Sequence, residues 1–149
     1  MQLTKFSDYA LRTLMLLAAA PDDATSIDAV ASALDVSAHH LGKVVVFLAD
    51  AGYVHTRRGR GGGITLATAA SAITVGAVLR ETERGAPLVP CFAPETNTCN
   101  LAPTCRLSAA LAGAEEAFYR SLDTLTLAEL VAPRTAARAT LLRLARPSG

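Results

Sequence analysis

Two short amphipathic segments joined by a three-residue turn restrict most strongly what this 149-residue chain can fold into. In residues 27–34 the apolar side chains recur at helical spacing; they are Ile27, Val30, Ala31 and Leu34. Residues 38–51 repeat this pattern with Leu41, Val44, Val45 and Leu48. Ser26 and Ser37 stand where N-caps are expected, and Gly52 ends the second segment. The spacing predicts a helix–turn–helix, in which Ala31 allows the helices to cross closely and Val36 fills the turn.

One stretch of the second segment has conflicting preferences. By propensity, Val44-Val45-Val46-Phe47 favours a strand, and Gly42 disfavours a helix by about 1 kcal/mol relative to alanine. The i, i+3, i+4, i+7 spacing of the apolar residues favours a helix, and we predict a helix here. Asp35 occupies the turn position usually held by glycine, and aspartate tolerates the left-handed conformation better than most residues.

A glycine- and arginine-rich run, RGRGGG at 58–63, lies between two short strand-like segments, residues 53–57 and 64–67. This predicts a β-hairpin, the wing of a winged helix–turn–helix, whose arginines can approach phosphates or a narrow minor groove. The alternative is a solvated hairpin tip. A Walker-type phosphate loop is excluded because no Lys-Ser/Thr follows the glycines. The predicted DNA contacts from the second helix and the wing are Ser37, His39, His40, Lys43, Arg57, Arg58, Arg60 and Gly61.

The overall charge does not itself indicate a nucleic-acid partner. The net charge is +1, and residues 1–63 carry six Lys/Arg against six Asp, so only the clustering of basic residues is informative. Apolar residues make up 51% of the chain, whereas aromatic residues make up 5% with no Trp. This composition supports a sizeable core and favours helices over a β-sandwich.

The predicted fold class is mainly α, a winged helix–turn–helix domain followed by a loop and a long helix. Helices are predicted at residues 4–20 and 75–83, and a long one at 106–122, followed by a last turn from Thr126 to Val131. The chain divides into a winged domain (1–83), a proline-rich loop (84–105), a long helix with its final turn (106–131) and a basic, partly disordered tail (132–149). The tail carries four Arg and no acidic residue.

Three cysteines, Cys91, Cys99 and Cys105, all fall in the proline-rich loop with the spacing C-x7-C-x5-C. No CxxC pair is present, which argues against a typical zinc site. Widely spaced thiolates suit an iron–sulfur cluster, and three cysteines leave one iron open or bound by oxygen or nitrogen. Zinc and three unconnected thiols are the alternatives.

The first helical segment imitates a signal-peptide core, because Leu14–Ala20 is apolar and Pro21 follows. However, Asp8 and Arg12 precede this run, which is only seven residues long. No stretch approaches the ~20 apolar residues of a membrane span. We therefore expect a cytoplasmic protein with reduced thiols.

Four stretches together resemble the Rrf family of winged-helix iron–sulfur transcription regulators. They are the opening LTKFSDYALR at 3–12, the wing RGRGGG, the loop CFAPETNTCNLAPTCRL and the closing LDTLTLAELV. Within the family, the chain is most similar to the nitric-oxide-sensing repressors. The resemblance covers residues 1 to about 131 and leaves out the tail.

The resemblance implies a homodimer in which residues 106–131 are the dimerisation helix with its final turn and residues 84–105 are the cluster-binding loop. Helix 106–122 would cross its partner, with each cluster near the partner's DNA-binding domain. It implies that Cys91, Cys99 and Cys105 are thiolate ligands, and that Asp8 of the partner subunit is the fourth ligand. An aspartate ligand accompanies a [4Fe–4S] cluster in the family, whereas other members hold [2Fe–2S]. The seven-residue first spacer is longer than in several relatives, so [2Fe–2S] stays open. Arg12 either neutralises the cluster's surroundings or forms an i,i+4 ion pair with Asp8.

The expected function is that of a transcriptional repressor that binds an operator in double-stranded DNA and loses affinity when nitric oxide nitrosylates its cluster. A first alternative is an iron–sulfur regulator of redox state or cluster supply. A remote alternative is an enzyme that uses a cysteine nucleophile with His39, His40 or His55, although no oxyanion-type motif lies nearby. The last alternative is a protein adaptor that uses the long apolar helix to bind its partners. The expected protein is not an enzyme.

Overall fold

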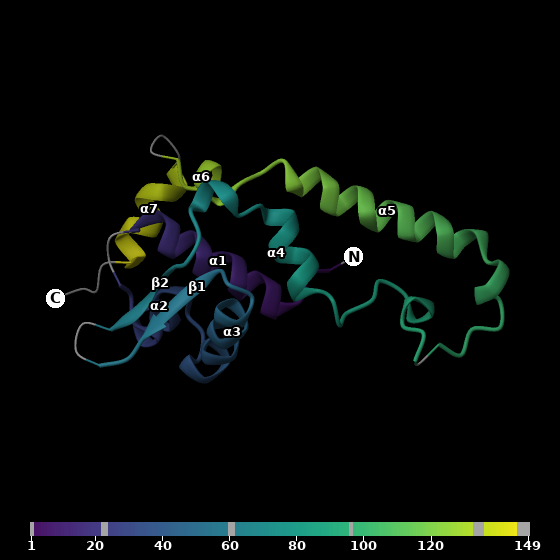
Figure 1. Cartoon of the computed structure of the whole chain (residues 1–149), viewed down its shortest axis with the longest axis horizontal. Helices are drawn as coiled ribbons and strands as arrows, with labels where there is room; N and C mark the ends of the chain where they lie inside the picture. Colours follow the sequence, from purple (N-terminus) through teal and green to yellow (C-terminus); the bar gives the residue numbers. More distant parts are fainter. Residues whose placement is uncertain (1, 22–23, 60–61, 96, 133–135, 146–149) are drawn as a thin grey trace.

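The structure, a computed structural model, describes residues 2–21, 24–59, 62–95, 97–132 and 136–145. Its longer elements are α1 (Lys5–Ala19), α2 (Ile27–Leu34), α3 (Ala38–Asp50), β1 (Val54–Arg57), β2 (Gly63–Leu66), α4 (Val75–Thr82), α5 (Arg106–Asp123), α6 (Leu127–Leu130) and α7 (Ala136–Ala145). Three short 3-10 turns are η1 (Ala70–Ala72), η2 (Pro90–Phe92) and η3 (Ala102–Thr104). Figure 1 shows most elements gathered in one lobe, from which α5 and the loop before it extend as an arm.

The helix–turn–helix forms through the local interactions that its sequence predicts. The hydroxyl of Ser26 accepts from Ala29 N–H at 3.1 Å and caps α2, and the hydroxyl of Ser37 accepts from His40 N–H at 3.2 Å and caps α3. Asp35 adopts the left-handed conformation with φ 54°. The valine run in α3 is helical, as its apolar spacing predicts.

The core of the lobe is built around α1. Leu14 and Leu17 of α1 pack with Leu41 and Leu48 of α3 and with Ile64 of β2, and all five are buried. The hairpin is antiparallel, with Val54 opposite Leu66 and Arg57 opposite Gly63. These contacts fix the positions of α3 and the hairpin relative to α1. The solvent-exposed face formed by α3 and the hairpin is therefore preorganised.

The segment after α5 departs from the predicted division of the chain. Leu127 of α6 is fully buried in the core of the lobe, and its N–H donates to the carbonyl of Ile73 at 2.9 Å. The final turn therefore belongs to the winged lobe and not to the arm. After α5 the chain returns to the lobe, because Leu127 packs into its core.

Within the predicted basic, partly disordered tail, residues 136–145 form helix α7. This helix packs against α1 and α2, and Leu141 is only 9% exposed. The charge of the tail suggested disorder, but Leu141 packs into the core and holds α7 against the lobe. The other residues of the tail on which this prediction falls, 133–135 and 146–149, lie outside the described residues.

None of the helices in the described part of the chain combines the length and the apolar character that crossing a membrane requires.

Candidate DNA-binding surface and cysteine loop

The exposed face of α3 carries three of the predicted DNA-contact side chains. His39, His40 and Lys43 are all exposed, and the centres of the two imidazole rings lie 5.9 Å apart. Ser37 is exposed as well, but its hydroxyl caps α3 by accepting from His40 N–H. The face combines one lysine and two imidazoles at the N-terminal end of a helix, which is the end that enters a major groove in helix–turn–helix proteins.

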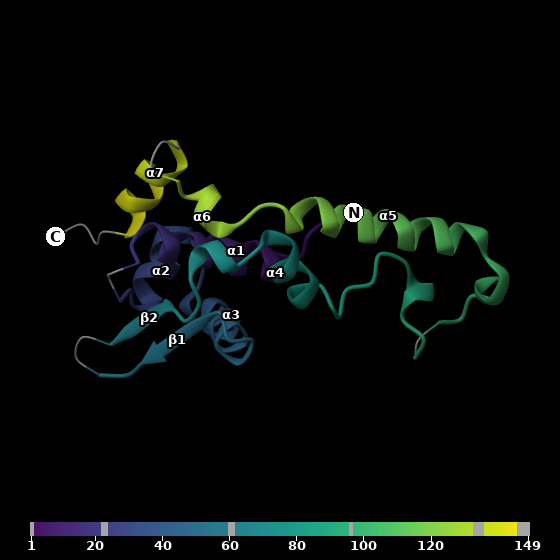
Figure 2. The same cartoon turned by 45° about the horizontal axis from the view of Figure 1, so that its top comes forward.

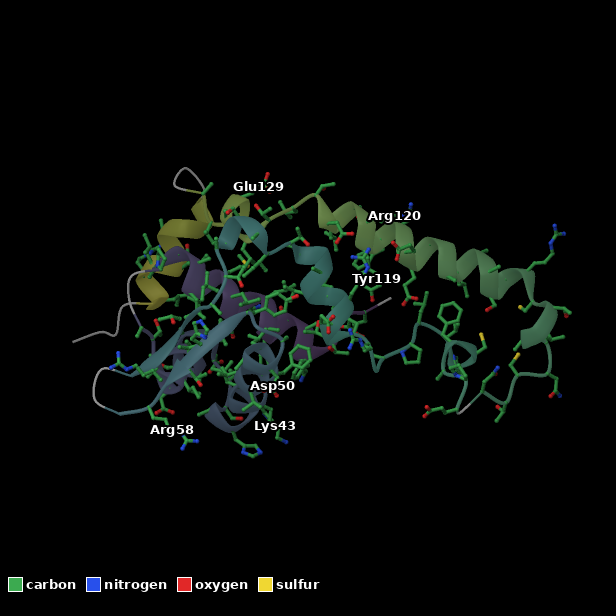
Figure 3. All side chains as sticks on the ribbon, viewed as in Figure 1. Lys43, Asp50, Arg58, Tyr119, Arg120 and Glu129 are labelled. Carbon is green, nitrogen blue, oxygen red and sulfur yellow. The ribbon has the colours of Figure 1, made fainter. Side chains whose placement is uncertain are left out.

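The hairpin places its basic residues on the same side of the molecule as α3. Arg57 and Arg58 are both exposed, and Figure 3 shows Arg58 and Lys43 along the lower edge of the lobe. Arg60 and Gly61, also predicted to contact DNA, lie outside the described residues. At the tip, Gly62 N–H donates to the carbonyl of Gly59 at 2.9 Å, in a turn that has no room for a side chain at 62.

The three cysteines lie on the loop at the far end of the arm. Cys91 is half-buried, and its Sγ lies 3.9 Å from the hydroxyl of Ser108 on α5. Cys105 is half-buried at the start of α5, whereas Cys99 is exposed, and its N–H donates to Asn97 Oδ1 at 2.9 Å. All three thiols are free. Within one chain, no group of three or more His, Cys, Asp or Glu among the described residues is arranged to hold a metal ion.

Asp8 lies in the first turn of α1, away from the part of the loop that carries the cysteines. Its Oδ1 accepts a hydrogen bond from Arg12 Nε at 2.8 Å, and both side chains are substantially exposed. The distal part of the loop, which includes η2 and η3, is separated from α1 in both views of the molecule (Figures 1 and 2). The two sets of predicted ligands, the cysteines and Asp8, are therefore not brought together within one chain.

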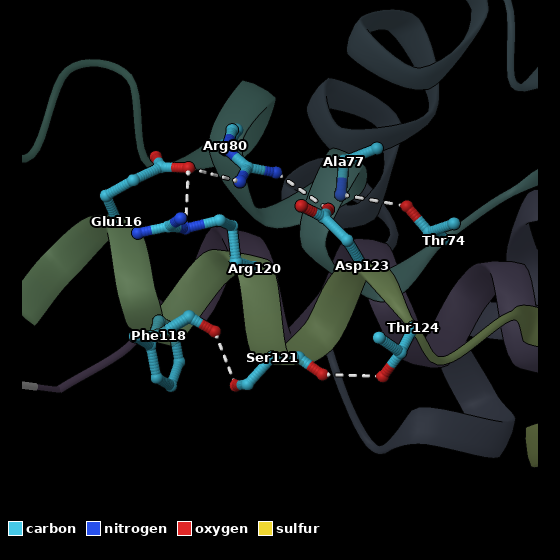
Figure 4. Close-up of polar contacts among 9 residues, drawn as sticks. All are labelled: Thr74, Ala77, Arg80, Glu116, Phe118, Arg120, Ser121, Asp123 and Thr124. Carbon is cyan, nitrogen blue, oxygen red and sulfur yellow. Dashed lines mark hydrogen bonds and ion pairs between the residues drawn. The ribbon is translucent and has the colours of Figure 1, made fainter.

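A polar junction that sequence patterns did not reveal joins α5 to α4. Arg80 of α4 donates to Asp123 Oδ1 at 2.7 Å and to Glu116 Oε1 at 3.2 Å (Figure 4). Its guanidinium lies 5.2 Å from the centre of the Tyr119 ring. The hydrogen bond from Arg80 lowers the pKa of Asp123, so this carboxylate stays charged near neutral pH. Gly76 permits the close approach, since a Cβ there would lie 2.6 Å from the Tyr119 carbonyl oxygen.

A second junction, likewise not revealed by the sequence, ties the start of the cysteine loop to the first turn of α1. Glu83 Oε1 accepts from the backbone N–H and the hydroxyl of Thr4 at 2.8 and 3.0 Å, and from the hydroxyl of Ser7, which is fully buried. The loop begins at the next residue, and Asp8 follows Ser7 on α1. The two junctions were not predictable from spacing, because each joins residues more than 35 positions apart.

The side of α5 that faces away from α4 is apolar and lacks a partner within the described residues. Its residues recur at helical spacing and are Leu107, Leu111, Ala114 and Phe118. None of the α5 residues is buried, and Leu107 is 66% exposed. Leu111, Ala114 and Phe118 line an open groove of about 520 Å³ together with Leu3, Leu88 and Glu115, which is the one charged lining residue among those described. A single chain therefore leaves an apolar seam along the arm.

Comparison with known proteins identifies relatives over almost the whole chain. The sequence model of the Rrf2 family, described as "Iron-dependent Transcriptional regulator", matches residues 3–133. The HTH-type transcriptional regulator NsrR of Geobacillus kaustophilus is 49% identical over 142 residues, which are 95% of this chain and 97% of that protein. NsrR of Halalkalibacterium halodurans is 46% identical over 132 residues, which are 88% of this chain and 90% of that protein.

Solved structures with the same fold include two other regulators. CymR of B. subtilis, described as the global cysteine regulator, is 26% identical, with a TM-score of 0.68 over 91% of this chain and 99% of that one. IscR of T. potens superposes with a TM-score of 0.72 over 92% of this chain and 90% of that one, at 20% identity, which is a likeness of fold. The predicted fold class, a mainly α winged helix–turn–helix, is confirmed.

Proposed function

Since this chain belongs to the Rrf2 family of transcriptional regulators, we propose that it is a homodimeric repressor whose three cysteines hold an iron–sulfur cluster and whose signal is nitric oxide. The family and the two close relatives establish a DNA-binding regulator and not an enzyme. The observation that carries the finer proposal is the 49% identity to a protein named NsrR along 95% of the chain. We place its action on operator DNA in the cytoplasm.

The basic face formed by α3 and the wing supports the proposed contact with DNA. Lys43 and Arg58 lie on one side of the lobe (Figure 3). In the proposed complex α3 enters the major groove with His39, His40 and Lys43, while Arg57, Arg58, Arg60 and Gly61 of the wing approach the sugar–phosphate backbone. Ser37 contributes through the cap that orients the first turn of α3.

Replacing Arg58 with alanine is expected to weaken binding to all duplexes, because one phosphate is no longer neutralised. The slope of log affinity against log salt should become shallower by about 0.9. The measurement is fluorescence anisotropy at several salt concentrations on an operator and on an unrelated duplex. Arg143→Ala is the matched control, because Arg143 is an exposed arginine of α7 and belongs neither to α3 nor to the hairpin. An unchanged slope for Arg58→Ala would remove this arginine from the interface.

The apolar seam on α5 supports the proposed homodimer. It lies opposite the face that Arg80 joins to α4, so two arms can cross without disturbing either junction. An exposed apolar stripe of this kind marks an interface in soluble proteins. Crossing arms also carry the cysteine loop of one subunit towards the other subunit's lobe.

The three cysteine thiols and the carboxylate of Asp8 are chemically suited to hold an iron–sulfur cluster. The three thiols are free and lie on one loop, and iron–sulfur clusters are held mainly by cysteine thiolates. Because one chain does not bring Asp8 to the cysteines, we assign the fourth position to Asp8 of the partner subunit. With a carboxylate as fourth ligand we favour a [4Fe–4S] cluster over [2Fe–2S]. When bound, the cluster supplies iron to which nitric oxide can bind.

The residues around Asp8 indicate how the signal would reach the DNA. A cluster held by the cysteines of one subunit and by Asp8 of the partner subunit would link the two subunits. This link would restrain the separation of the two α3 helices, which must match two half-sites one helical turn apart. Arg12 Nε donates to Asp8 Oδ1 at 2.8 Å, so Arg12 can stabilise the charge of this carboxylate. Loss of Asp8 as a ligand would free the winged lobes from this restraint.

The test is a gel-shift titration of anaerobic protein on one operator duplex, selected from random-sequence DNA, before nitric oxide, after nitric oxide and after cluster removal. We expect nitric oxide to weaken binding about 5- to 150-fold, the range typical of such coupling. Anaerobic iron and sulfide analysis should show no cluster in Cys99→Ala and reduced retention in Asp8→Ala. Equal affinities in the three states would contradict the mechanism. Release by oxidants alone would instead support the redox-sensing alternative.

A further inference from the structure

Two neighbouring positions on α3, Gly42 and Val46, are poor choices for a helix surface that only faces water. Glycine is among the least favourable residues inside a helix, and valine loses side-chain freedom there. A Cβ on Gly42 would meet no atom of the described chain within 4 Å, so packing within the chain does not require glycine. Val46 is 60% exposed, so it gains little from the core. Breaks of local preference of this kind are expected where a surface has a function.

Gly42 and Val46 lie on the face of α3 that we assign to DNA. They are four residues apart, so the missing side chain at 42 leaves a notch beside the methyl groups of Val46. Val46 also follows His39 by seven residues, or two turns, and so stands on the same line of the helix. The buried residues Leu41 and Leu48 occupy the opposite face. Val46 therefore lies about 10 Å beyond His39 along the face that would enter the groove.

The surroundings of the notch combine positive charge with apolar surface. Gly42 and Val46 line a hollow of about 440 Å³ between α3 and the hairpin, together with Thr56, Arg57 and Arg58. The arginines provide charge complementary to a phosphate backbone. Among the base edges in the major groove, the 5-methyl group of thymine provides an apolar contact that the valine methyl groups can match.

We infer that Val46 reads a thymine in each half-site by packing against its 5-methyl group, and that Gly42 is glycine so that this methyl can enter the notch. The inference rests on the proposed placement of α3 in the major groove and does not depend on the cluster. It makes Val46 a specificity-determining residue, because the same contact with cytosine lacks the methyl group.

The experiment compares thymine with deoxyuridine, which pairs identically but lacks the methyl group. Duplexes that bind wild-type protein are first selected from random-sequence DNA. Each thymine of a selected site is then replaced in turn by deoxyuridine, and the affinity is measured by fluorescence anisotropy. For wild-type protein we expect one position in each half-site at which the replacement weakens binding about three- to fivefold, as burial of one methyl group predicts.

Three variants assign the effect to the notch. Val46→Ala should bind thymine and deoxyuridine at that position equally, whereas Leu144→Ala, which truncates an exposed leucine on α7, should keep the wild-type ratio. Gly42→Ala should raise the melting temperature, because alanine favours the helix, and yet reduce the discrimination by filling the notch.

Two results would overturn the inference. Either wild-type protein shows no thymine preference at any position, or Val46→Ala retains the full ratio. A loss of affinity in Val46→Ala that is equal on all duplexes would assign Val46 to the sugar–phosphate backbone and would also overturn base readout. In each case wild-type binding with a steep salt dependence would leave the proposed DNA-binding function intact.

Discussion

Leu111→Glu is expected to convert the proposed homodimer into monomers. Leu111 stands in the middle of the apolar side of α5, and with Ala114 and Phe118 it lines the groove that we assign to the partner's arm. A glutamate at this position would place a carboxylate in an apolar interface without a partner, which costs several kcal/mol. Operator affinity should fall as well, because a monomer presents one α3 to a two-part site. Sedimentation equilibrium measures the association directly.

The matched control for Leu111→Glu is Ala109→Glu. Ala109 is exposed on the same helix and lies on the opposite side from the apolar residues. The control adds the same charge to α5 and should stay dimeric, with operator affinity close to wild type. If Leu111→Glu sedimented as a dimer, the seam would lie elsewhere on the molecule.

Gly76→Ala is expected to lower the free energy of unfolding by about 1–3 kcal/mol, the usual penalty for forcing extra volume into a packed contact. The new Cβ would lie 2.6 Å from the Tyr119 carbonyl oxygen and 2.8 Å from the Asp123 backbone nitrogen, so α4 and α5 would have to separate. The hydrogen bond between Arg80 and Asp123 would lengthen, and the arm would lose its orientation relative to the winged lobe. Thermal unfolding and operator affinity should both report the change.

A second glycine-to-alanine variant separates this clash from the general effect of the substitution. Gly113 lies within α5, and a Cβ there would meet no atom of the described residues within 4 Å. Gly113→Ala should therefore stabilise the protein by up to about 1 kcal/mol through helix propensity. If the two variants unfolded at the same temperature, the close approach at Gly76 would not be the cause.

The helix–turn–helix and the hairpin were predictable because their determinants are local. The α2 range of 27–34, the caps at Ser26 and Ser37 and the left-handed Asp35 all depend on residues within four positions of one another. In α3 the spacing of the buried residues outweighs the strand propensity of the valines, since Leu41, Val44, Val45 and Leu48 reach the core only from a helix. The cysteine spacing likewise indicates a ligand set, because all three thiols belong to one short loop.

Only the tertiary structure decided how these parts are joined. Asp123 pairs with Arg80 across 43 positions and Glu83 with Thr4 across 79, and no short-range pattern marks residues that meet at such separations. Helix α7 docks through Leu141 although its charge suggested a disordered tail. Asp8 and the three cysteines are not brought together within the described part of one chain, so the proposed ligand set needs a second subunit. Local periodicity determines which segments form helices, whereas contacts between distant segments depend on the shape of the whole core.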